Sequence, residues 1–158
     1  MGATDENRTM ALADLPASLP AFLCFAVYST NLAFHRAYKP LFEGLGITYP
    51  QYVVLVALNE EDDQNVSQLG EKLFLESSTL TPLLKRMEAM GLVTRRRDPE
   101  DERQVRIGIT PQGRSVFEKV FCGCHSILGA SGLDPDTYAR LQGDLTRLRD
   151  NLLAAGGK

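Results

Sequence analysis

The chain has 158 residues, of which 44% are hydrophobic and 23% are charged, and this is the size and composition of about one globular domain. These values exclude a disordered chain, collagen-like repeats and a pure coiled coil. Because 17 basic and 20 acidic side chains give a formal net charge of −3, contact with nucleic acid would require a local basic patch.

The apolar segments and the cysteines of the sequence indicate in which cellular compartment the protein works. The sequence has no run of 18 apolar residues, and its N-terminus lacks the basic start and apolar core of a signal peptide. We therefore expect a cytoplasmic protein without membrane contact. Three cysteines, Cys24, Cys122 and Cys124, are an odd number, which argues against a disulfide framework. Each is a buried filler, a metal ligand or a reactive thiol.

The N-terminal part is expected to be a tail followed by a long helix. Residues 1–15 are polar and aperiodic, which predicts a flexible tail. Over residues 16–42 apolar side chains recur at helical spacing, which predicts a long first helix. Pro40, together with Gly44 and Gly46, is expected to close this helix.

The next segments predict a helix-turn-helix. Residues 50–59 are almost continuously apolar, which favours a buried helix, although the valines also allow a strand. Val66, Leu69 and Leu73 mark a short helix, and residues 76–79 form a polar turn. A second short helix follows, and its apolar face consists of Leu80, Leu83, Leu84 and Met87. Two short helices joined by a tight polar turn are typical of this motif.

A hairpin and two helices complete the chain. Residues 92–97 and 105–109 have strand-like patterns and predict a β-hairpin, which after a helix-turn-helix is a wing. Thr110 and Pro111 predict the start of a fifth helix reaching about Gly129, and Pro135 opens a sixth.

The predicted fold class is mainly α with a small β-hairpin wing. It is a winged helix-turn-helix domain with further helices at its N- and C-terminal ends. A long projecting helix must bury its apolar stripe, and a second copy of the chain could cover it, so we expect these to be dimerisation helices. We expect a single domain over residues 16–158. Within it, residues 50–110 form the winged helix-turn-helix part, and residues 16–48 and 111–158 form the dimerisation helices.

The second short helix has a polar, cationic face. On a helical wheel Ser78, Pro82 and Lys85 lie opposite the apolar face, flanked by Thr81 and Arg86. Hydroxyls near a helix N-terminus can contact phosphates or base edges, and Lys or Arg can neutralise phosphates or bind guanine. A solvated surface helix would have a similar face, so the wing has to be considered with it.

The wing adds a basic patch. Between Lys85 and Arg97 the chain has five cations and one anion, Glu88. Arg103 at the hairpin tip is placed to enter a minor groove, and Asp101 would orient its guanidinium through a charge-assisted bond. The predicted DNA-binding residues are Ser77, Ser78, Thr79, Thr81, Lys85, Arg86, Arg95, Arg96, Asp101 and Arg103.

Cys24 lies in an apolar stretch of the first helix and has two interpretations. A free cysteine there is often a small buried hydrophobe. However, Tyr28 lies four residues on, and Tyr38 and Tyr49 follow; phenol hydroxyls can donate hydrogen bonds that stabilise a thiolate. Tyr38 is about 21 Å from Cys24 along an unbroken helix, so these two residues could meet only across a dimer.

The sequence resembles the organic hydroperoxide resistance regulators, the OhrR branch of the MarR family. The resemblance covers residues 19 to about 115 and rests on LCFAVYS (23–29), AYKPL (37–41), LGITYPQY (45–52), LTPLLKRME (80–88) and DER (101–103). It implies a homodimeric repressor of double-stranded DNA with a pseudo-palindromic operator. It also implies that an organic hydroperoxide oxidises Cys24 to sulfenic acid, and that Tyr38 and Tyr49 of the partner subunit hold the thiolate.

The other cysteines depart from that family pattern. Some relatives have a resolving cysteine near the end of the fifth helix, but Cys122 and Cys124 lie several residues earlier. Either could resolve the sulfenic acid if the helix unwinds, and otherwise a small external thiol would do so. Cys122, Cys124 and His125 also resemble a metal cluster but lack a fourth ligand, so we expect no metal.

Two other functions are compatible with parts of the sequence. A MarR-type repressor could instead be released by a phenolic or other small effector, with Cys24 structural. A thiol peroxidase could use Cys24 and Cys124, but no Arg or Thr stands beside Cys24 to polarise a peroxide, and the basic wing would have no role. The sequence has no GxSxG, Gly-rich phosphate loop or HExxH motif. We therefore expect a regulator without a cofactor, and not an enzyme.

Overall fold

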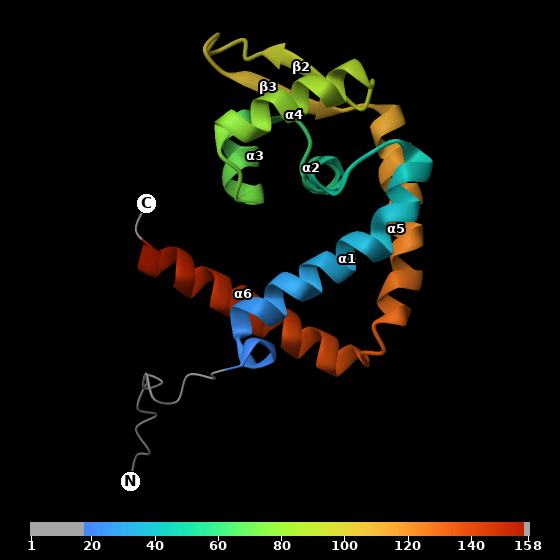
Figure 1. Ribbon diagram of the computed structural model, residues 1–158. Helices are drawn as coiled ribbons and strands as arrows, with labels where there is room; N and C mark the ends of the chain where they lie inside the picture. Colours follow the sequence, from blue (N-terminus) through green and yellow to red (C-terminus); the bar gives the residue numbers. More distant parts are fainter. Residues whose placement is uncertain (1–17, 157–158) are drawn as a thin grey trace. The chain divides into compact units, whose positions relative to one another are not determined.

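The computed structural model describes residues 18–156, and Figure 1 traces the chain. The chain divides into two compact units, one ending at Pro40 and the other beginning at Leu41. The predicted tail of residues 1–15 lies outside the described residues. Long helices and one small antiparallel sheet confirm the predicted fold class.

The first helix extends further than predicted. After a short 3-10 turn, η2 (Leu19–Ala21), helix α1 runs over Leu23–Leu45 and contains Pro40 in its interior. The expectation that Pro40 helps to close the helix was wrong. Proline removes one backbone N–H, but Phe42 beyond it is buried, with 6% of its surface exposed, and this burial favours another helical turn. Gly46 then ends the helix in the left-handed region, with φ +67°.

Helices α2 and α3 follow the prediction. Residues of the apolar stretch form helix α2 (Tyr49–Glu60) and no strand. Helix α3 (Val66–Leu73) begins with a reciprocal cap, because Asn65 and Gln68 each accept the other's backbone N–H at 2.8 Å. Such caps fix where α3 starts and leave its apolar side toward the core.

The turn of the helix-turn-helix is earlier than predicted. Phe74 ends α3 in the left-handed region, with φ 56°, and helix α4 covers Ser77–Ala89. Residues 77–79 are therefore the first turn of α4 and not part of the connecting turn. Ser and Thr are tolerated there because short polar side chains suit helix N-termini. The motif itself is confirmed.

The wing is confirmed, and the sheet has one strand more than predicted. Strands β2 (Val93–Arg97) and β3 (Val105–Ile109) pair antiparallel, with Val93 opposite Ile109. The additional strand β1 (Gln64–Asn65) pairs with the other edge of β3, so the order is β1-β3-β2. Two residues are too short to show a period-two pattern, which is why the sequence did not reveal β1.

The core lies between the helices and the sheet of the second unit. Its large, fully buried side chains are Val54, Leu55, Leu58, Leu69, Leu80, Leu84, Met87, Leu92, Ile107 and Val120. They come from α2, α3, α4, the wing and α5, so the winged helix-turn-helix part has one continuous hydrophobic core.

Two long helices complete the fold as predicted. Helix α5 (Pro111–Ala130) is capped by Thr110, whose side chain accepts the Gly113 N–H at 2.9 Å. Helix α6 (Pro135–Gly156) has no buried residue. Within residues 18–156 no single helix is long and apolar enough to cross a membrane, and α1 and α2 reach that length and hydropathy only when counted together across their bend.

Candidate DNA interface and cysteine sites

Helix α4 separates its apolar and polar residues as the helical wheel predicted. Leu80, Leu83, Leu84 and Met87 are buried. The exposed residues on the other side include Ser77, Ser78, Thr79, Pro82, Lys85 and Arg86, and Thr81 is half-buried. Burial of one face fixes the rotation of the helix. The hydroxyls and cations that could meet a major groove are therefore held outward by the core on the opposite side.

The basic residues of α4 and of the wing differ in their partners. Lys85 and Arg86 are exposed and make no salt bridge within the described part of the chain. Arg95 instead pairs with Glu88 at 3.2 Å and has a side chain only 19% exposed. Arg96 pairs with Asp63 at 2.5 Å. Intramolecular carboxylates thus neutralise part of the positive charge that the sequence placed on β2.

The wing tip has the ion pair expected from the sequence. The backbone N–H and Nε of Arg103 both donate to Asp101 Oδ1, at 3.1 and 3.2 Å, while 92% of the Arg103 side chain is exposed. The pKa of Asp101 is lowered by these two hydrogen bonds, and the one from the Arg103 backbone has the larger effect. A charged Asp101 therefore orients an arginine that is open to solvent at the tip of the wing.

Several residues that hold the wing were missed from the sequence. The acidic pair after α2 binds wing and α5 residues: Asp62 accepts the Ile109 N–H at 2.9 Å and pairs with Arg114 at 2.6 Å. Asp63 binds Arg96 and Arg106. No local pattern predicts these contacts, because the partners of the two carboxylates lie more than 30 residues further along the chain.

In the first unit, Cys24 lies near the start of α1 and is exposed. Tyr28 is one turn further along the same helix face and is 58% exposed, with its ring 6.4 Å from that of Phe25. Tyr38 is half-buried on the same helix. The interpretation of Cys24 as a buried hydrophobe does not fit its exposure in the single chain.

In the second unit, Tyr49 and the C-terminal cysteines occupy different helices. Tyr49 is the first residue of α2, and its ring meets Phe42 edge-on at 6.1 Å. On α5, Cys122 is exposed and Cys124 is half-buried. Cys124 Sγ lies 3.7 Å from the hydroxyl of Tyr52, a contact between residues 72 positions apart. Within residues 18–156 no group of three or more His, Cys, Asp or Glu could hold a metal ion.

Comparison with protein families and curated proteins identifies similar regulators. A family model described as transcriptional regulator SarA/Rot matches residues 36–120. The chain is 48% identical over 144 residues to the HTH-type transcriptional regulator TtmR of Methylorubrum extorquens, covering 91% of this chain and 74% of that protein. It is 43% identical over 130 residues to the organic hydroperoxide resistance transcriptional regulator of Bacillus subtilis, covering 82% and 88%.

Solved structures agree with these matches. A probable transcriptional regulator from Pseudomonas aeruginosa superposes with a TM-score of 0.76 at 26% identity, covering 83% of this chain and 99% of that chain. Reduced AbfR bound to DNA superposes with a TM-score of 0.66 at 36% identity, covering 83% and 91%. AbfR has also been solved overoxidised on DNA and in a disulfide-formed state.

Proposed function

Because the chain belongs to the MarR family of winged-helix transcriptional regulators, in the branch of the organic hydroperoxide resistance regulators, we propose that it is a homodimeric repressor that senses organic hydroperoxides through Cys24. The family consists of DNA-binding regulators and not of enzymes. The observation that carries the proposal is an exposed cysteine on α1 in a chain so similar to a hydroperoxide resistance regulator.

DNA would be bound by α4 and the wing. The exposed hydroxyls and cations of α4 enter the major groove, and Arg103 enters the adjacent minor groove. Arg95 and Arg96 would add long-range attraction for phosphate, weakened by their carboxylate partners. Two copies of α4 in a dimer would read half-sites about one helical turn apart, so the operator would be a pseudo-palindrome.

Exposed apolar side chains support the dimer. Large hydrophobic residues are exposed along three helices: Leu19, Phe22, Leu23, Val27, Leu32 and Phe34 in and before α1, Phe121 and Leu128 in α5, and Tyr138, Leu141, Leu145, Leu152 and Leu153 in α6. Extended apolar surface of this kind marks an interface. We assign residues 16–48 and 111–158 to dimerisation and residues 50–110 to DNA binding, in a cytoplasmic protein.

The sensing chemistry needs only a thiolate and a hydroperoxide. The Cys24 thiolate attacks the terminal oxygen of the hydroperoxide, an S–O bond forms as the O–O bond breaks, and the leaving alkoxide takes a proton from water to become an alcohol. Cys24 becomes a sulfenic acid. Tyr38 and Tyr49 of a second copy, with Tyr28 of the same chain, would supply phenol hydrogen bonds to the sulfur before the attack.

A second step would complete the switch. The sulfenic acid condenses with a thiol, forming an S–S bond and releasing water. Cys124, Cys122 or a small external thiol can supply that group. AbfR has been solved bound to DNA in both reduced and overoxidised forms, and a disulfide-formed structure of it is also known. We therefore assign the release of DNA to disulfide formation.

The test is DNA release on oxidation. A fluorescent duplex from the protein's own promoter region is bound by wild type, Cys24→Ser, Cys122→Ser and Cys124→Ser, and cumene hydroperoxide is added at one equivalent. We expect wild type to release DNA and Cys24→Ser to stay bound. Cys122→Ser and Cys124→Ser each keep Cys24 and lose one of the other two thiols; if either still releases DNA while Cys24→Ser does not, the effect belongs to Cys24.

The remaining variant and the opposite result are equally informative. Retention of DNA by oxidised Cys124→Ser would make Cys124 the resolving thiol, and release would assign that role to Cys122. If wild type releases DNA only after a small thiol is added, the external thiol has that role. Release of DNA by Cys24→Ser would contradict the proposal. A repressor controlled by a small effector, with Cys24 structural, would then be the function to pursue.

A further inference from the structure

Two arginines of the wing lie directly opposite each other on neighbouring strands. Arg96 on β2 and Arg106 on β3 are register partners in the antiparallel pair. Like charges directly opposite each other destabilise such a pair. The hairpin at this position therefore depends on a negative group close to both side chains.

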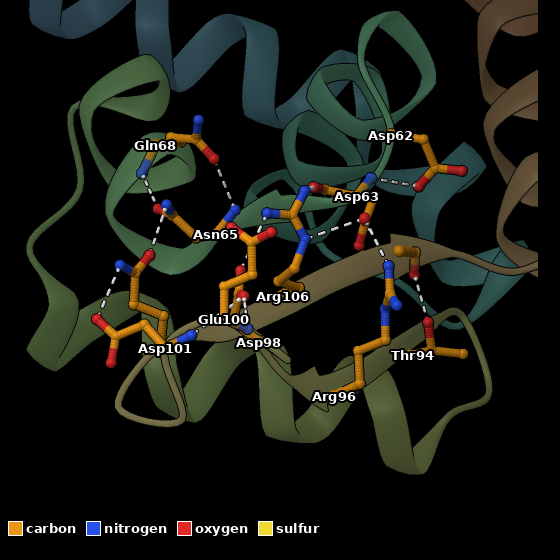
Figure 2. A network of polar contacts seen from close by, with 12 residues as sticks. Asp62, Asp63, Asn65, Gln68, Thr94, Arg96, Asp98, Glu100, Asp101 and Arg106 are labelled. Carbon is orange, nitrogen blue, oxygen red and sulfur yellow. Dashed lines mark hydrogen bonds and ion pairs between the residues drawn. The ribbon is translucent and has the colours of Figure 1, made fainter.

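Asp63 supplies that group from outside the hairpin. Its Oδ2 accepts hydrogen bonds from Arg96 Nη2 at 2.5 Å and from Arg106 Nε at 2.9 Å (Figure 2). Its backbone carbonyl also accepts from Arg106 Nη2. The hydrogen bond from Arg96, together with that from Arg106, lowers the pKa of Asp63, so the carboxylate is charged at neutral pH.

Asp63 belongs to the body of the domain and not to the wing. It lies between the end of α2 and β1, and its backbone is left-handed, with φ 57°. Residues other than glycine adopt this conformation rarely, and it persists where the surrounding structure fixes it. The next residue, Gln64, pairs with Ile107 of β3, so Asp63 is fixed at the point where the body meets the wing.

The same contacts continue to the wing tip. Arg106 Nη1 donates to Asp98 Oδ2 at 3.2 Å, and Asp98 Oδ1 accepts the backbone N–H of Glu100 at 2.9 Å, which shapes the turn. That turn carries Asp101 and the exposed Arg103. Ion pairs of Arg106 and backbone hydrogen bonds to Asp98 thus connect the end of α2 with the tip of the wing.

We propose that Asp63 is a positioning residue for DNA binding, which fixes the wing against the body of the domain so that Arg103 reaches the DNA. This inference rests on the proposed entry of Arg103 into the minor groove. It makes a prediction opposite to that of charge alone. By Coulomb's law, removal of an acidic group near the DNA strengthens binding to phosphate, whereas loss of the anchor weakens it.

The experiment measures DNA affinity by fluorescence anisotropy at one fixed salt concentration, with the same promoter duplex. Asp63→Asn keeps the size of the side chain and removes its charge, and we expect it to bind at least about fivefold more weakly, within the range of a lost specific contact. Glu102→Gln is the matched control, because it removes an exposed carboxylate at the wing tip. We expect it to bind as tightly as wild type or more tightly.

A second variant separates placement from charge and folding. Arg106→Lys keeps the net charge but replaces a planar fork of donors by a single ammonium group, which cannot reproduce the separate contacts of Nε, Nη1 and Nη2 with Asp63 and Asp98. We expect it to weaken DNA binding in the same direction as Asp63→Asn. Thermal unfolding of both variants is measured as a control, to check that they are folded at the temperature of the binding assay.

A double-mutant cycle with Arg103→Ala decides between the inference and its premise. If Asp63 acts through Arg103, Asp63→Asn has little further effect once Arg103 is removed. If Arg103→Ala weakens binding but Asp63→Asn strengthens it, or adds its full effect to that of Arg103→Ala, the positioning role is wrong while the proposed DNA contact stands. If Arg103→Ala leaves affinity unchanged, the proposed contact and the inference both fail.

Discussion

Gly113 tests how tightly the wing is joined to α5. A Cβ added at this position would lie 2.2 Å from the backbone oxygen of Leu92 and 3.0 Å from Ile109 Cγ1. A backbone carbonyl cannot rotate away as a flexible side chain can, and the Leu92 carbonyl also accepts the Thr110 N–H at 3.2 Å. Overpacking of this kind costs about 1–3 kcal/mol, and each hydrogen bond lost adds about 1 kcal/mol. Alanine recovers at most about 1 kcal/mol of helix propensity, so Gly113→Ala should lose about 1–3 kcal/mol.

Urea unfolding measures this loss. Because the stability of a dimer depends on concentration, wild type and variants are compared at one protein concentration. A loss of about 1–3 kcal/mol moves the midpoint down by about 0.5–1.5 M urea, for a slope of about 2 kcal/mol per M. Gly129→Ala is the matched control, since it lies in the same helix and an added Cβ there meets nothing within 4 Å; it should be neutral or stabilising. Equal midpoints for Gly113→Ala and wild type would refute the close packing of the corner.

Three further predictions concern the N-terminal cap of α5, the contact of a lysine with DNA phosphates, and the dependence of stability on pH. Thr110→Val removes the hydroxyl that accepts the Gly113 N–H and should lower the free energy of unfolding by about 1–2 kcal/mol; an unchanged urea midpoint would contradict this. Lys85→Ala should weaken DNA binding and reduce the slope of log K against log salt by about 1, whereas Lys119→Ala on α5 should leave the slope unchanged. Because the pKa of Asp63 is lowered from 3.8, its stabilising contribution is present above that pH and lost below it. The difference in melting temperature between wild type and Asp63→Asn should therefore be constant over roughly pH 5–8 and close only under more acidic conditions.

Most of the fold could be predicted from local sequence patterns. The apolar spacing of α4 predicted which residues are buried, because a helix repeats every 3.6 residues and four apolar side chains are enough to set the face. The ion pair between Asp101 and Arg103 was also predictable from local sequence, because the two residues are only two positions apart in one turn. The end of α1 was not predictable in this way, because the local preference of Pro40 to stop a helix competes with the burial of Phe42, which depends on the tertiary structure.

The contacts that place the site are between distant parts of the chain. Asp63 and Arg106 are 43 residues apart, and their contact requires both the register of the hairpin and a third strand of two residues. The signal available in advance was the hairpin itself: pairing Val93 with Ile109 puts Arg96 opposite Arg106, and two facing cations require a carboxylate from elsewhere. The hairpin does not say which carboxylate this is, because Glu88 and Asp98 are nearer to Arg96 along the chain than Asp63 is.

The wing and α5 are joined at a corner, through which the proposed disulfide at Cys124 would act on DNA binding. Thr110 donates to the Gly91 carbonyl at 2.7 Å and caps α5 through the Gly113 N–H, so the end of the wing and the start of α5 share one hydrogen-bonded residue. Helix α5 then continues for 20 residues and carries Cys124. Because a packed corner without room for one methyl group cannot absorb a displacement, a shift of α5 caused by a disulfide at Cys124 would move the wing with it.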